Sequence, residues 1–414
     1  MKKIALFMLA AGCWILPVGA QDFSYEVIQR GDGVFYAPER PTVELSVANG
    51  GVRADSACVS LTVTTDDHRP VCALSQQVLV PAGARIPVHF AFTVPAPGFY
   101  CCALTADDGA EIRRFNIGYE PEFIVSLGDA QPDLREFWDR ARAELDAVAP
   151  EYELTLLPEK SGKAREIYLV RMKSLGGETI QGYYARPVKK GKYPAIVSYM
   201  GYGSEPWCPD PNTPDFVDFV LSVRGQGLNE PENTYGDWIT WGLDDKEHYY
   251  YRGAFMDLIR AIDFLCSREE VRADAIFAEG GSQGGAFTLA ACALDHRIRA
   301  GAPFIPFLSD YPDYFRISQW PATPVLRRQR ELGIDDAALY RTLSYFDIKN
   351  LTPWITCPIM MGVGLQDEVC PPHTNFSGYN RISSEKRYWI FPQCGHDVGP
   401  EWWPARMEFF KKYL

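Results

Sequence analysis

Apolar and polar residues alternate in short runs from Gln21 to about Gly118. Turn-forming residues such as Asn49-Gly50-Gly51 and Asp107-Asp108-Gly109 separate these runs. Alternation with a period of two is typical of strands that bury one face. The clearest runs are residues 43–47, 58–63, 86–94, 98–104 and 112–117. Their regular spacing predicts a small all-β sandwich of immunoglobulin type over residues 21–118.

A different pattern begins at residue 119 and continues to residue 414. Helical spacing of apolar residues occurs in Pro132 to Ala149, Arg252 to Cys266 and Glu401 to Tyr413. Strand-like runs lie between them, at residues 167–172, 182–188, 195–199, 216–223, 275–278, 302–307, 358–363 and 387–391. The first two of these runs are expected to form an antiparallel pair. Strands alternating with helices predict a doubly wound α/β fold, with a mostly parallel sheet covered on both faces.

The N-terminus is expected to be a signal peptide spanning residues 1–20. Lys2-Lys3 precede an apolar run from Ile4 to Leu16, and Val18-Gly19-Ala20 fits a cleavage site. Cys13 lies in a loose lipoprotein box, but the apolar run continues past it, so we favour cleavage over lipidation. This predicts a periplasmic or secreted protein without a membrane span.

Composition narrows the class of protein. The chain has 414 residues, which is long for one domain, and 47% of them are hydrophobic and 23% charged. A formal net charge of −12 argues against nucleic acid or anionic membrane as a partner. The cysteines that follow the signal peptide lack metal-ligand spacing, so we expect mostly free thiols and no metal site.

The candidate nucleophile is Ser282, within AIFAEGGSQGGAFTLA at residues 275–290. A strand-like run leads into the serine and a helical run follows it, which is the context of a nucleophile elbow. Gly280 and Gly284 leave room where a Cβ atom would clash with neighbouring backbone. The following helix directs its N-terminus and the Gln283 N–H at the reacting oxygen.

A serine nucleophile needs a histidine base and an acid that orients the base. In the α/β-hydrolase fold these follow the serine in the order acid, then histidine. His396 lies in a glycine-flanked loop after the last predicted strand, so it is preferred to His296 and His373. Asp367 is the first carboxylate after the preceding strand, and we expect it to be the acid.

The second oxyanion donor is expected in the loop after residues 195–199, which reads Met200-Gly201-Tyr202-Gly203. Glycines on both sides of Tyr202 allow its N–H to approach a substrate. Gln283 and Tyr202 are therefore the predicted oxyanion residues.

Four motifs occur in this order along the chain: Arg224-Gly225-Gln226-Gly227, Gly280 to Gly285, Gly364-Leu365-Gln366-Asp367 and Gly395-His396-Asp397. With them the chain from about Asp129 resembles the acetyl xylan esterase and cephalosporin C deacetylase family, carbohydrate esterase family seven. The resemblance implies that Ser282, Asp367 and His396 form a triad. It also implies that Tyr202 and Gln283 give the oxyanion N–H groups and that Arg224 and Gln226 brace the loops. No metal or organic cofactor is implied.

The chain departs from the family pattern at several positions. Met200 replaces a histidine before the oxyanion-loop glycine, and Ser222 replaces an aspartate two residues before the Arg-Gly-Gln motif. Asp397 replaces a glutamate after the catalytic histidine. The β-sandwich is an addition, and it leaves open whether the chain forms the homo-oligomer common among relatives.

These observations predict a secreted serine esterase that removes acetyl groups from acetylated sugars such as xylo-oligosaccharides. One alternative is a serine peptidase of the prolyl-oligopeptidase type, which shares the fold and the order of the triad. Another is an inactive hydrolase fold that serves as a glycan-binding scaffold. The sequence does not show a carboxylate pair placed to bind a peptide N-terminus, and its triad is complete, so we rank both below the esterase.

Overall fold

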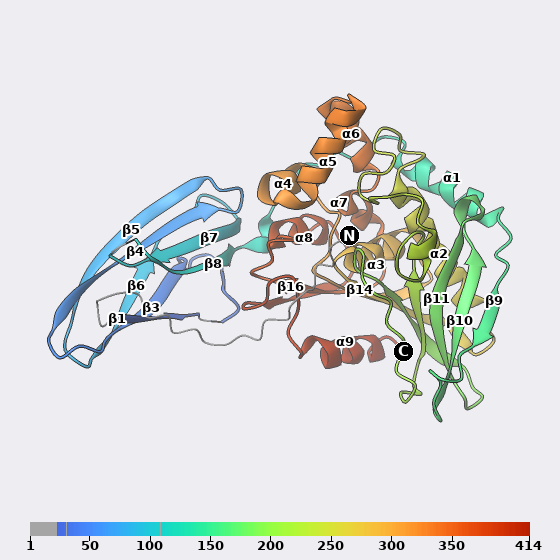
Figure 1. Cartoon of the computed structure of the whole chain (residues 1–414), viewed down its shortest axis with the longest axis horizontal. Coiled ribbons are helices and arrows are strands. Elements are labelled where there is room, and N and C mark those ends of the chain that lie inside the picture. The colour runs from blue at the N-terminus through green and yellow to red at the C-terminus, as the bar shows by residue number, and fades with distance from the viewer. Residues whose placement is uncertain (1–22, 30, 108) are drawn as a thin grey trace.

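The computed structural model describes residues 23–29, 31–107 and 109–414; the predicted signal peptide and its cleavage site lie outside these ranges. The first eight strands form two sheets at one end of the molecule (Figure 1). One sheet has the order β1-β3-β6 and the other the order β2-β8-β7-β4-β5. Strand bounds are β1 Phe23–Ile28, β2 Val34–Phe35, β3 Thr42–Asn49, β4 Asp55–Thr65, β5 Pro70–Val80, β6 Arg85–Ala91, β7 Gly98–Thr105 and β8 Glu111–Tyr119. We call this unit, residues 23–119, the β-sandwich.

Alternation along these strands creates the core of the β-sandwich. Leu45, Val59, Leu61 and Leu104 are fully buried between the sheets, and along β4 the neighbours of Val59 and Leu61 are more exposed, as alternation requires. The prediction of a β-sandwich is confirmed. Sequence analysis missed β1, β2 and β5, and it extended β6 beyond Ala91.

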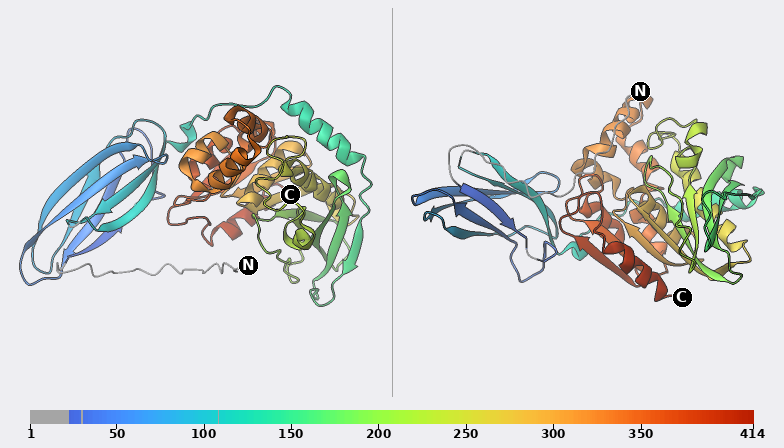
Figure 2. Two further views of the ribbon diagram at one scale, coloured as in Figure 1. Left: turned by 45° about the horizontal axis from the view of Figure 1, so that its top comes forward. Right: turned by 60° about the horizontal axis from the view of Figure 1, so that its bottom comes forward.

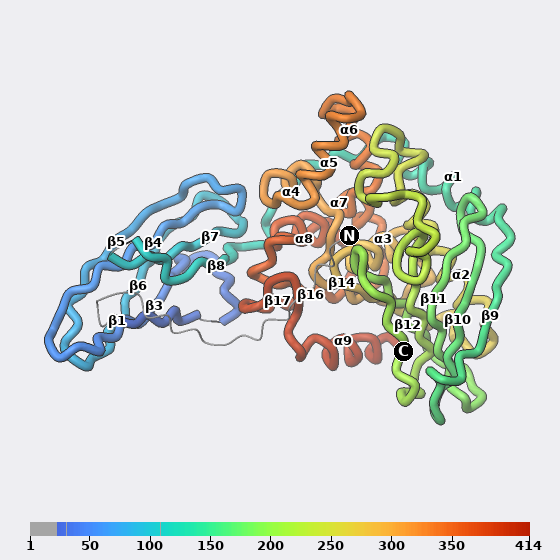
Figure 3. Tube along the Cα trace, viewed as in Figure 1, coloured from blue at the N-terminus to red at the C-terminus, as the bar shows by residue number. Residues whose placement is uncertain are grey.

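The rest of the chain is organised around one nine-stranded sheet with the order β17-β16-β15-β14-β12-β13-β11-β10-β9. Neighbouring strands pair antiparallel from β9 through β10 and β11 to β13. From β13 through β12, β14, β15 and β16 to β17, neighbouring strands pair parallel, as the α/β prediction requires. The bounds are β9 Glu153–Leu156, β10 Arg165–Lys173, β11 Thr179–Pro187, β12 Tyr193–Tyr199, β13 Val217–Ser222, β14 Val271–Gly281, β15 Ile298–Phe304, β16 Ile359–Gly364 and β17 Lys386–Phe391. The edge strand β17 lies nearest the β-sandwich (Figure 3), and the hydroxyls of Tyr36 and Tyr388 are 2.6 Å apart across that boundary.

Helices cover both faces of this sheet. Helices α1, α2, α3, α7 and α8 pack on one face around a core that includes Trp138, Phe255 and Phe287, while α9 covers the other face through Trp402 and Phe410. The bounds are α1 Leu134–Asp146, α2 Tyr250–Cys266, α3 Gln283–Leu294, α4 Tyr311–Ile317, α5 Gln319–Leu332, α6 Asp336–Ser344, α7 Ile348–Leu351, α8 Pro372–Tyr379 and α9 Trp402–Lys411. Four short 3-10 helices are η1 Pro121–Phe123, η2 Leu175–Gly177, η3 Gly227–Glu232 and η4 Thr352–Trp354. The chain between η1 and α1 passes from the β-sandwich across the face of the sheet on which α1, α2, α3, α7 and α8 pack (Figure 2).

Two parts of this fold differ from the sequence prediction. The strand expected at residues 302–307 runs from Ile298 to Phe304, because Ile305 has a φ of 41° and cannot continue a strand. Sequence analysis assigned no elements to residues 308–357, where α4 to α7 and η4 lie. Within the described residues, none of the helices has the length and apolar character needed to cross a membrane.

Candidate active site

Ser282 lies at the tip of a strained turn between β14 and α3. Its backbone has a φ of 57° and a ψ of −120°, a combination that non-glycine residues rarely adopt. The turn holds because its neighbours are glycines. A Cβ on Gly284 would lie 2.1 Å from the Tyr199 carbonyl oxygen, and one on Gly280 would lie 2.5 Å from the Gly284 carbonyl oxygen. The sharp turn therefore exposes the serine hydroxyl at the carboxyl edge of the sheet, as expected for a nucleophile elbow.

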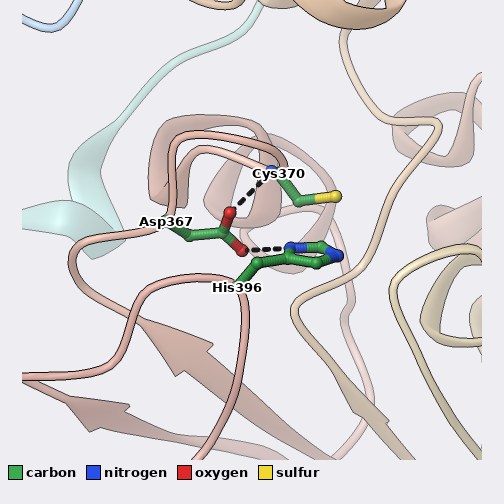
Figure 4. A group of neighbouring side chains, drawn as sticks. All are labelled: Asp367, Cys370 and His396. Carbon is green, nitrogen blue, oxygen red and sulfur yellow. Dashed lines mark hydrogen bonds and ion pairs between the residues drawn. The ribbon is translucent and has the colours of Figure 1, made fainter. Parts of the chain in front are cut away.

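Two loops bring an imidazole and a carboxylate to that hydroxyl. His396, in the loop after β17, places its Nε2 2.9 Å from the Ser282 Oγ. Its Nδ1 lies 2.9 Å from Oδ2 of Asp367, in the loop after β16 (Figure 4). Asp367 is almost fully buried, and its other oxygen accepts hydrogen bonds from the N–H groups of Val369 and Cys370, each at 2.8 Å. The carboxylate is thus held in one orientation, which fixes the imidazole ring.

The predicted oxyanion donors lie on two different elements at the carboxyl edge of the sheet. Gln283 is the first residue of α3, so its N–H has no partner within the helix and points out of its N-terminus. Tyr202 lies in the loop after β12, and its hydroxyl donates to Asp237 at 2.5 Å. The Tyr202 ring also packs edge-on against Trp238 and Trp320. These contacts fix the loop that carries the Tyr202 N–H.

Gln226 connects the two oxyanion elements. Its side-chain amide accepts a hydrogen bond from the Gly203 N–H at 3.1 Å, and it exchanges hydrogen bonds with the amide of Gln283 at 3.1 and 3.2 Å. It also donates to the Tyr250 hydroxyl at 2.8 Å. Gln226 therefore links the loop of Tyr202 directly to the first turn of α3.

Arg224 anchors the loop after β13 to helix α2. Its Nη2 and Nε lie 2.7 and 3.0 Å from the two carboxylate oxygens of Asp257, which is fully buried. Burial alone would lower the pKa of the Arg224 guanidinium, but the charge and hydrogen bonds of Asp257 raise it above its usual range. A buried, bidentate pair of this kind fixes Gln226 two residues further along the chain.

Cys370 is a neighbour of Asp367 and His396 to which sequence analysis assigned no role. Burial, with a further contribution from the charge of Asp367, raises the pKa of its thiol well above the usual range, so the thiol stays protonated. Ser282 also contacts the thiol. Asp367, Cys370 and His396 together bring three potential metal-ligand atoms within 4.8 Å of one another (Figure 4), but hydrogen bonds already use the oxygens of Asp367.

The structure separates the rejected candidates from the site. His296 bonds to Thr356, and His373 lies between Asp66 and Asp313. Asp397 is exposed and accepts from the N–H of its neighbour Val398. All seven residues that the sequence singled out lie at one edge of the sheet. The contacts that join them also involve Asp257, Tyr250 and Tyr251, whose hydroxyl donates to the side-chain oxygen of Gln283 at 3.0 Å. Sequence analysis assigned no role to Asp257.

Comparison with known proteins gives a consistent set of relatives. The family model described as acetyl xylan esterase (AXE1) matches residues 126–414. Acetyl esterase Axe7A of Xylanibacter ruminicola is 29% identical over 339 residues, which cover 78% of this chain and 76% of that protein. The solved acetyl xylan esterase from Paenibacillus sp. R4 is 31% identical, with a TM-score of 0.65, and the match covers 71% of this chain and 99% of that one. Acetyl xylan esterase 1 from Thermoanaerobacterium sp. JW/SL YS485 is 29% identical, with a TM-score of 0.64 and coverages of 71% and 98%.

Proposed function

Because the chain belongs to the acetyl xylan esterase family, we propose that it is a secreted serine esterase that deacetylates acetylated sugars such as xylo-oligosaccharides. An acetyl esterase acting on carbohydrate follows from the family and its relatives. The serine nucleophile, the sugar and the export of the chain are our proposal. The observation that supports the serine mechanism most strongly is the continuous line of hydrogen bonds from Ser282 through His396 to Asp367, with both distances at 2.9 Å.

The proposed reaction has two halves. Ser282 Oγ attacks the acetyl carbonyl carbon while its proton passes to Nε2 of His396, and Asp367 stabilises the imidazolium. The carbonyl oxygen becomes an oxyanion that accepts hydrogen bonds from the N–H groups of Gln283 and Tyr202. The bond to the sugar oxygen then breaks, and His396 protonates the departing sugar hydroxyl.

Water completes the cycle on the acetyl-serine intermediate. His396 takes a proton from water, whose oxygen attacks the acetyl carbon. The bond to Ser282 Oγ breaks, the serine recovers its proton from His396, and acetic acid leaves and releases its proton to solvent as acetate. The enzyme returns to its starting protonation state, so the reaction needs only water as a second substrate.

Replacement of the nucleophile tests this mechanism. We expect Ser282→Ala to reduce kcat for acetate release by about a thousandfold or more, because no hydroxyl remains to form the acetyl-enzyme. Ser384→Ala is the matched control, since Ser384 donates to the Cys357 carbonyl oxygen outside the site. Retention of more than a few per cent of p-nitrophenyl acetate turnover in folded Ser282→Ala would contradict the proposal.

The substrate is tested separately. Acetate release should be compared across acetylated xylo-oligosaccharides, other acetylated glycans and an aminoacyl-proline anilide. We expect release from the acetylated sugars and no cleavage of the anilide. Cleavage of the anilide would favour the peptidase, and failure of a fluorophosphonate probe to label Ser282 in the folded chain would favour the inactive scaffold.

We also propose that residues 1–20 are removed on export and that residues 21–118 and 119–414 are separate domains. The β-sandwich has its own hydrophobic core, β8 ends at Tyr119, and the family match begins at residue 126, all of which support the domain division. Mass spectrometry of the protein recovered outside the cytoplasm should find Gln21 as its first residue. A lipid on Cys13 would contradict this cleavage site.

A further inference from the structure

The side chain of Gln366, the residue directly before Asp367, contacts the β-sandwich. Its Oε1 accepts a hydrogen bond from the Asn116 N–H at 2.6 Å, and its Nε2 donates to the Asn116 carbonyl oxygen at 3.2 Å. The Asn116 side chain in turn donates to the Leu365 carbonyl oxygen at 3.2 Å. Two adjacent residues of the acid loop are therefore bonded to one residue of β8.

The Gln366 amide takes the place that a neighbouring strand would occupy. Asn116 faces Cys101 of β7 on one side of β8, and β2 covers the other side only at Gly118 and Tyr119. The N–H and carbonyl of Asn116 would otherwise form an open sheet edge. A primary amide offers an acceptor oxygen and two N–H donors, so its oxygen and one N–H satisfy both groups of Asn116 at once.

The same amide also reaches the loop that carries His396. Its Nε2 donates to the Pro392 carbonyl oxygen at 2.9 Å, and the Gln366 backbone N–H donates to the Cys394 carbonyl oxygen at 2.9 Å. Gln366 thus joins the β-sandwich, the acid loop and the base loop. Its hydrogen bonds run from the acid loop to the backbone of the β-sandwich and of the base loop.

The far end of the acid segment is attached to the β-sandwich as well. Nδ1 of His373, in the first turn of α8, lies 2.9 Å from the carboxylate of Asp66, which follows β4. One turn further, the ring of Phe376 lies 5.7 Å from that of Phe99 on β7. The β-sandwich therefore holds the chain on both sides of Asp367.

We propose that the β-sandwich positions the catalytic acid and that Gln366 is the positioning residue through which it does so. This inference rests on the proposed serine mechanism. The Asp367 carboxylate is oriented by the N–H groups of Val369 and Cys370, which lie within the segment held at both ends. A shift of this segment moves the carboxylate relative to His396, and a displacement of about 1 Å can cost roughly a hundredfold in rate.

Gln366→Met tests the inference, because methionine keeps the length of the side chain and removes the amide. We expect kcat for p-nitrophenyl acetate to fall about tenfold to a hundredfold, with KM within about twofold of the wild type. The decisive measurement repeats the change in an Asp367→Asn background. If Gln366 acts through Asp367, adding Gln366→Met to the Asp367→Asn variant should lower kcat by less than about twofold.

Tyr36→Phe is the matched control, because it removes a hydrogen bond between the β-sandwich and β17 at a distance from the acid loop. It should leave kcat within about twofold of the wild type. If Gln366→Met fails to fold, Asn116→Ala replaces it, because this change deletes only the side-chain hydrogen bond to Leu365. We expect Asn116→Ala to lower kcat several-fold in the wild-type background and to leave kcat unchanged in the Asp367→Asn background. Unchanged kcat in the folded variant, or an equal loss with and without Asp367, overturns the inference. Full turnover in Ser282→Ala instead overturns the serine mechanism and the inference with it.

Discussion

The hydroxyl of Ser222 donates a hydrogen bond to the sulfur of Met200, with 3.4 Å between the two atoms. Both residues are buried, at 1% and 5% exposure. They are also the two positions where the chain departs from the aspartate and histidine usual in its family. The two departures therefore meet in one contact at the base of the oxyanion loop, where a neutral pair occupies the place of two ionisable side chains.

Restoring the family residues should show that these positions are coupled. Ser222→Asp alone buries a carboxylate without a partner, and we expect it to lower the free energy of unfolding by about 3 kcal/mol. Combined with Met200→His, the loss should be smaller than the sum of the single losses by about 1 to 3 kcal/mol. Urea unfolding of the wild type, both single variants and the double variant gives this coupling energy.

Ser222→Ala serves as the control for the cycle. It removes only the hydroxyl, which bonds to Met200 and accepts from the Leu228 N–H at 3.2 Å, so a loss of about 1 kcal/mol is expected. Strict additivity of the two restoring substitutions would show that the contact does not couple the positions.

Arg224 lies across Gly253 of α2, which explains a glycine in the middle of a buried helix. A Cβ at residue 253 would stand 2.2 Å from Nη1 of Arg224. Glycine to alanine in a helix ordinarily stabilises by about 1 kcal/mol. Here we expect Gly253→Ala to destabilise by about 2 kcal/mol or more, because the guanidinium must break its pair with the buried Asp257 to make room.

Urea unfolding measures this effect, and the esterase assay shows whether it spreads to the site through Gln226. Gly378→Ala on α8 is a matched control, because its nearest neighbour, the Ser309 hydroxyl, lies 3.2 Å from the new Cβ and a small shift relieves it. A stabilised Gly253→Ala would mean that Arg224 leaves its position easily and does not brace the loop.

The nucleophile turn could be predicted from the sequence because its cause is local. Glycines at residues 280 and 284 are needed by the backbone of the turn itself, and the strand and helix on either side carry their own hydrophobic patterns. The order of the strands along the chain, and the acid and the histidine that follow two of them, could be predicted in the same way. Most strands of both units were predicted where alternation or an apolar run was uninterrupted, but β1 was missed although its sequence FSYEVI alternates.

Other missed elements lacked such a signal. Strand β5 carries Ser75, Gln76 and Gln77 at its centre, because much of it is exposed at the edge of its sheet. Helix α5 contains Pro321 and Pro324, and prolines inside a segment argue against a helix in the sequence.

Contacts between segments that are distant along the chain could not be predicted from the sequence either. The pairs Ser222 with Met200 and Gln366 with Asn116 depend on how strands are ordered in space, and an isolated glutamine or serine carries no mark of its partner. The two departures from the family pattern were visible in the sequence, but their contact was not.

His373 lies between two carboxylates at the boundary of the β-sandwich. Its Nδ1 is 2.9 Å from Asp66 and its Nε2 is 3.2 Å from Asp313 of α4. Burial by itself would lower the pKa of His373, but the close contact with the Asp66 carboxylate and its charge, with further charge from Asp310 and Asp67, raise it above its usual value of 6.5. The protonated ring is therefore favoured in the folded protein.

This pairing should make the stability of the chain depend on pH. A pKa that is higher in the folded state than in the unfolded state stabilises fully below the unfolded value and loses that contribution as the pH rises through the folded value. We expect His373→Asn to lower the free energy of unfolding by about 2 kcal/mol at pH 6, where charged hydrogen bonds are lost, and by less at pH 8.5. Urea unfolding of both proteins across this range gives the difference. His248→Asn is the control, because the His248 side chain is 78% exposed in its pair with Asp245 and solvent screens that pair. A difference between wild type and His373→Asn that grows with rising pH would mean that the ring is neutral in the folded protein and that the two carboxylates do not hold its proton.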